Sequence, residues 1–125
     1  FRNGLNLGQL EGGIDWVLAS MPEAQDPEVM QRMIYAFAER HRWAAHKWVE
    51  RQEPGLVRDV THAAVADRMS VNSDYREALA NVESISDATL RAETLQLVRE
   101  RWREDDRENT KRDLPPELLQ QLQNQ

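Results

Sequence analysis

The residues best suited to chemistry are concentrated in the stretch AFAERHRWAAHKWVE, residues 36–50. It holds two of the four tryptophans and two of the three histidines, together with the cations Arg40, Arg42 and Lys47. Histidines can bind a metal ion or transfer protons, and an exposed tryptophan can anchor a binding partner. The stretch is therefore either a functional site or a seam where helices pack.

The histidines His41, His46 and His62 limit the possible metal sites. His41 and His46 are separated by about 140° around a helix, so they cannot bind one ion together. His46 could meet His62 across a helical hairpin with Glu50 one turn further on, which would supply two zinc ligands and a carboxylate. Because such pairs often arise by chance on neighbouring helices, we expect no metal ion and no cofactor.

Catalytic patterns are missing from the sequence. The chain has no cysteine, which excludes disulfides and thiol nucleophiles, and it has no G-x-S-x-G, H-E-x-x-H or phosphate-binding glycine loop. Its carboxylate pairs lie among arginines on polar faces, where solvation is more common than acid–base catalysis. We therefore expect a protein that is not an enzyme.

The aromatic residues give the strongest indication of binding. Trp48 and Trp102 fall on apolar helix stripes and are predicted to be core residues. Trp16, Tyr35 and Trp43 fall beside such stripes, which favours a second buried face over a partner-binding surface. The candidate binding residues are Trp16, Tyr35, Trp43, His46 and His62.

The composition narrows the range of partners. The net charge is −6 and the pI is about 5.1, so a broad phosphate-binding surface for nucleic acid is not expected. No apolar run approaches the roughly 18 residues that span a bilayer, so membrane insertion is not expected either. The chain starts at Phe1, which fits a processed protein or a fragment and leaves the compartment open.

Apolar residues recur at helical spacing along nearly the whole chain. Stripes run through residues 10–21, 30–37, 44–49, 57–69, 75–82 and 90–102, and a short helix is predicted from Pro115 or Pro116. Asp26 followed by Pro27 is a typical helix start. No segment alternates as a strand does, so the predicted fold class is all-α.

Three similar pentapeptides indicate an internal repeat: AFAER at 36–40, AVADR at 64–68 and LVRER at 97–101. Each has apolar positions followed by an acid and an arginine, a match that periodicity alone does not explain. We predict one domain, 1–125, of antiparallel helical hairpins stacked as a short α-solenoid. The hairpins are placed at about 10–40, 43–69 and 74–102, with C-terminal capping helices over 105–123.

The helix pairs, with DYREAL opening one helix and WREDD closing its partner, resemble α-helical hairpin repeats of the tetratricopeptide and HEAT-like kind over residues 26–114. The tetratricopeptide pattern W-x2-L-G-x2-Y is absent, so the resemblance is to a class and not to one family. It implies a protein-binding or scaffolding role without chemistry.

Three functions follow as hypotheses. The first is a module that binds a protein or peptide along its helices. The second is a small-ligand or metal sensor built on Trp43, His46 and His62, and the third is an oligomeric structural protein. The charged run at residues 99–113 is expected to be a solvated connector with an i,i+4 pair between Arg101 and Asp105.

Overall fold

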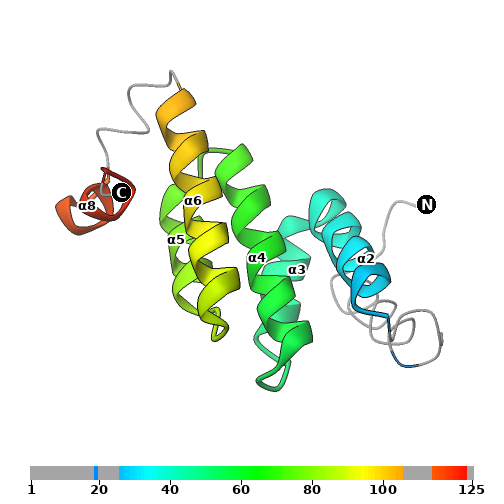
Figure 1. The fold of residues 1–125 in the computed structure, drawn as a ribbon. Helices are drawn as coiled ribbons and strands as arrows, with labels where there is room; N and C mark the ends of the chain where they lie inside the picture. The colour runs from blue at the N-terminus through cyan, green and yellow to red at the C-terminus, as the bar shows by residue number, and fades with distance from the viewer. Residues whose placement is uncertain (1–18, 20–25, 106–113, 124–125) are drawn as a thin grey trace.

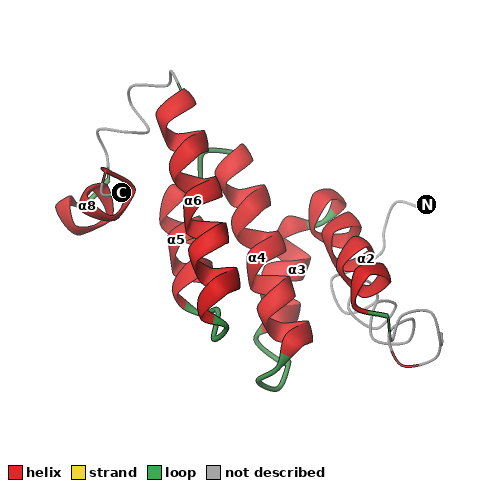
Figure 2. Ribbon diagram, in the orientation of Figure 1, coloured by secondary structure: helices red, strands yellow, loops and turns green. Residues whose placement is uncertain are grey.

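The structure, a computed structural model, describes residues 26–105 and 114–123 together with Ala19. These residues form six helices and contain no strand, which confirms the all-α prediction (Figure 2). The helix expected around residues 10–21 lies outside the described residues except for Ala19. The helices are α2 (Pro27–Arg40), α3 (Arg42–Val49), α4 (Leu56–Val71), α5 (Tyr75–Glu83), α6 (Ala88–Glu104) and α8 (Pro116–Gln123).

Two of the helices begin at aspartates that cap exposed backbone N–H groups. Asp26 accepts a hydrogen bond from the backbone of Glu28 at 2.9 Å, which confirms the predicted start of α2. Asp87 accepts from the backbone of Leu90 at 2.8 Å at the start of α6. Asp74 precedes α5 but makes no capping bond with its side chain.

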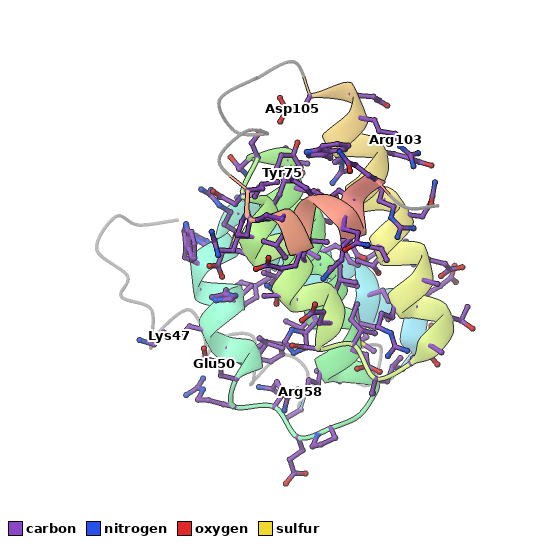
Figure 3. The ribbon with its side chains drawn as sticks, turned by 90° about the vertical axis from the view of Figure 1, so that its left-hand side faces the viewer. Lys47, Glu50, Arg58, Tyr75, Arg103 and Asp105 are labelled. Atoms are coloured by element: carbon purple, nitrogen blue, oxygen red, sulfur yellow. The ribbon has the colours of Figure 1, made fainter. Side chains whose placement is uncertain are left out.

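The helices lie in two layers with α4 in the centre. Helices α2, α4 and α6 run side by side, while α3 and α5 lie behind them, as the two views in Figures 1 and 3 agree. Helix α4 packs against α2, α3, α5 and α6. The chain reverses direction in the loops after α3, α4 and α5 (Figure 1).

The central position of α4 explains its burial. All residues from Asp59 to Ala66 are buried, around the whole circumference of the helix. Three of them are alanines, Ala63, Ala64 and Ala66, whose small side chains allow neighbouring helices to approach closely. The stripe predicted from sequence, from Val57 to Met69, covers one side of this helix and misses the others.

Helix α2 buries Met30, Ile34 and Ala38, which lie one turn apart on one face. Phe37 packs partly buried beside them, as predicted, but Ala36 is exposed. The expectation that Ala36 is a packing position is therefore wrong. It lies about 200° around the helix from Ile34, on the opposite face.

Helix α8 packs against α6 at the C-terminal end of the described chain (Figure 1). Leu122 is fully buried, and Leu114 and Leu118 lie against the core. Arg99 on α6 donates from Nε to the carbonyl of Gln121 at 2.7 Å. The predicted start at Pro116 is confirmed, whereas residues 106–113 of the predicted capping segment lie outside the described residues.

Candidate interaction site

Three polar side chains from three helices meet: the buried His62 on α4 and Asn81 on α5, and the partly exposed His46 on α3. Asn81 Oδ1 lies 2.8 Å from His62 Nδ1, and Asn81 Nδ2 lies 3.4 Å from His46 Nδ1. Asn81 also donates to the carbonyl of Glu77 at 2.8 Å, which fixes its amide. His46 and His62, which could meet as zinc ligands on sequence grounds, are thus joined only through an asparagine that is not among the predicted site residues.

The amide oxygen of Asn81 can only accept, so His62 carries a proton on Nδ1. His46 Nε2 lies 3.7 Å from the carboxylate of Glu77. The carboxylate near His46 is therefore Glu77, and Glu50, the expected partner, is exposed at the end of α3.

His62 is only 6% exposed, in contrast to the half-exposed position expected for it. Its Nε2 is buried without a hydrogen-bond partner among the described residues. Burial lowers the pKa of His62, while the bond to Asn81 raises it in part and nearby Arg58 lowers it further. His62 is therefore a neutral core residue that cannot contact a ligand directly.

Trp43 lies on the outer side of α3 and is 49% exposed, so the expectation that it packs against a neighbouring helix is wrong. Its ring is nevertheless held in place. The guanidinium of Arg42 lies over it at 5.7 Å from the centroid, and the ring of His46 meets it edge-on at 5.7 Å. Trp48 is fully buried, as predicted, and contacts Phe37 edge-on.

We define the Trp43 face as Arg42, Trp43, His46 and Lys47. Arg42 lies 3.8 Å from Asp74, with both side chains about a third exposed. Lys47 is exposed and points away from the molecule (Figure 3). The face therefore combines a supported aromatic ring, exposed apolar area and cationic groups along about one and a half turns of α3.

Tyr35 does not join this face. Tyr35 on α2 is partly buried against the core near Arg101 of α6, and burial raises the pKa of its hydroxyl while Arg101 lowers it in part. Trp16 lies outside the described residues. The four predicted site residues that the structure describes thus divide into a surface pair, Trp43 and His46, a buried His62, and a separate Tyr35.

Arg101 does not pair with Asp105 as expected. It instead reaches α4, where it contacts the carboxylate and carbonyl of Asp67. Asp105 accepts hydrogen bonds from Tyr75 at 2.5 Å and from Ser73 at 2.7 Å. Asp105 and Tyr75 lie near each other in Figure 3. The start of the charged run therefore links helices and is not a solvated connector.

Asp59 is a functional candidate that the sequence analysis missed. It is 6% exposed and accepts hydrogen bonds from the backbone and hydroxyl of Ser86 and from the backbone of Asp87. Burial raises its pKa, but these bonds outweigh burial and the net pKa is lowered. An open hollow of about 480 Å³ adjoins it, lined by Gln31, Gly55, Leu56, Asp59, Ser86, Asp87 and Leu90. Since Asp59 and Asp87 are engaged with backbone, this region is primarily structural.

Within the described part of the chain, no group of three or more His, Asp or Glu residues could hold a metal ion. No helix in that part is long and apolar enough to cross a membrane. No protein-family model, curated protein or solved structure matches this chain. The function is therefore inferred from the residues themselves.

Proposed function

We propose that this protein is a non-catalytic interaction module that binds a protein or peptide at the Trp43 face. The observation that carries this proposal is the half-exposed Trp43 ring, held between Arg42 and His46. A large aromatic ring in a fixed position offers much apolar contact area at a small cost in conformational entropy. Tryptophan and arginine are also the residues that most often dominate binding energy.

The arrangement of helices supports a scaffold role. Helices α3 and α5 begin at Arg42 and Tyr75, and α4 and α6 begin at Leu56 and Ala88, in the order expected for successive helix pairs. Stacked pairs would form a short α-solenoid, in which side-by-side helices present an extended surface to a partner. This repeat interpretation is part of the proposal and accounts for the position of α3 at the edge of its layer.

Selection of binders from a random peptide library displayed on phage tests the proposal. We expect peptides that bind the wild-type protein and lose about tenfold or more in affinity for Trp43→Ala. Since Trp43 is half exposed, this variant should keep the wild-type helical circular dichroism and melting temperature.

Two results would contradict the proposal. One is a selection that returns no binder to the wild-type protein. The other is a set of binders whose affinity is the same for Trp43→Ala as for the wild type. Arg103→Gln on α6 is the matched surface control, because Arg103 is exposed on another helix (Figure 3).

A further inference from the structure

The charge around Trp43 is opposite to that of the whole chain. Residues 40–51 contain the cations Arg40, Arg42, Lys47 and Arg51 against one acid, Glu50, although the chain as a whole carries −6. Arg42 is about a third exposed with its guanidinium over the Trp43 ring, and Lys47 is exposed one turn further along the same helix. The Trp43 face is therefore a cationic region on an acidic protein.

Neighbouring acids neutralise this region only in part. Asp74 lies 3.8 Å from Arg42 and Glu77 lies 3.7 Å from His46, both at the outer limit of ion-pair distance and with all four groups more than a quarter exposed. Such exposed pairs contribute little energy and exchange readily for other partners. Arg42 can therefore exchange Asp74 for an incoming carboxylate beside the Trp43 ring.

From this charge complementarity we infer that the Trp43 face binds an acidic segment of a partner protein, with one apolar side chain against the ring. Carboxylates of the segment would pair with Arg42 and Lys47, which flank Trp43 on the same helix. A basic segment would meet like charge at these positions. This inference rests on the proposed interaction function and specifies the chemistry of the partner.

Three short fluorescein-labelled peptides with the same central Leu-Leu pair test the inference by fluorescence anisotropy. Their flanking residues are Asp and Glu, Ser and Gln, or Lys. We expect the acidic peptide to bind about tenfold more tightly than the neutral one, and added salt to reduce the difference. The Lys peptide should bind most weakly.

Charge-matched variants locate the binding. Lys47→Gln on the Trp43 face should weaken the acidic peptide by about two- to fivefold, whereas Arg103→Gln, which removes the same charge from α6, should not. Trp43→Ala should weaken both the acidic and the neutral peptide, because it removes the apolar contact that they share.

Several outcomes would overturn the inference. If the neutral or the Lys peptide bound as tightly as the acidic peptide, or more tightly, the inference would be overturned. The proposed interaction function would still hold, because the library binders would still depend on Trp43. Displacement of the acidic peptide by an oligothymidylate would assign the face to nucleic acid. A concentration-dependent dimer in light scattering that Trp43→Ala abolishes would assign it to a second copy of this chain. Absence of binding by all three peptides would also overturn it, and the library selection then decides separately whether the interaction function holds.

Discussion

At the scale of single residues, the two histidines of one polar cluster differ in their exposure to solvent. His46 lies at the surface beside Trp43, while His62 lies in the core, and Asn81 joins them. Helical periodicity allowed His46 and His62 to meet across a hairpin as zinc ligands, but the structure joins them only through Asn81. The sequence did not point to Asn81, because no sequence pattern distinguishes a buried asparagine on a helix from a solvated one.

Stability should depend on pH through His62. Its pKa is lowered in the folded protein, so the unfolded chain binds more protons as pH falls below about 6.5. The free energy of unfolding should therefore be highest above that pH, decrease below it, and level off once pH is below the folded pKa. Urea unfolding at a series of pH values measures this dependence.

His62→Gln should flatten this part of the pH dependence. His46 lies nearby, and its charge lowers the pKa of His62. Arg58 and Asp59 also face His62: the charge of Arg58 lowers the pKa of His62, and the charge of Asp59 raises it. If the free energy of unfolding of His62→Gln varied with pH as it does in the wild type, His62 would not be the titrating group.

At the scale of elements, one buried acid joins two helix ends. Asp59, in the first turns of α4, accepts from the backbone of Ser86 and Asp87 in the loop before α6. The loop thereby obtains partners for N–H groups that have none within a helix. The predicted cap at Asp26 was a local signal, but this contact joins residues 27 positions apart and depends on packing.

Asp59→Ala should destabilise the protein by about 2 kcal/mol, because it leaves these donors without an acceptor and removes a carboxylate whose pKa is lowered by them. Chemical denaturation at neutral pH measures the loss. Asp74→Ala is the control, with an expected change of less than about 1 kcal/mol, since Asp74 makes no capping bond and pairs weakly with Arg42. Equal effects of the two substitutions would contradict this role for Asp59.

At the scale of the whole molecule, the central helix sets the spacing between layers. Helix α4 contacts four other helices, and its alanines Ala63, Ala64 and Ala66 are fully buried among them. A side chain larger than alanine at these positions must displace a neighbouring helix.

Ala64→Leu should therefore destabilise the protein by about 1–3 kcal/mol through overpacking. The matched control is Ala80→Leu on α5, which introduces the same side chain at an exposed position and should change stability by less than about 0.5 kcal/mol. Thermal and urea unfolding of both variants provide the comparison. A stable Ala64→Leu would indicate looser packing around α4 than the structure shows.

The candidate site was predicted from sequence in part. Residue types and spacing selected Trp43 and His46, and these two do meet at the surface. The same reasoning expected Trp43 to be buried, because a tryptophan beside an apolar stripe is consistent with either environment. Tyr35 shows the other outcome, since it also lies beside its stripe and packs partly buried against the core.

The sequence by itself determined the helical class, most helix starts and the burial of Trp48, because periodicity, capping and proline act over a few residues. The tertiary structure decided which sides of each helix are covered. It buried α4 around its circumference, left Trp43 at an edge, joined His46 to His62 through Asn81 and turned Arg101 toward Asp67. These outcomes depend on how many neighbours each helix has, and that number arises only when distant segments pack together.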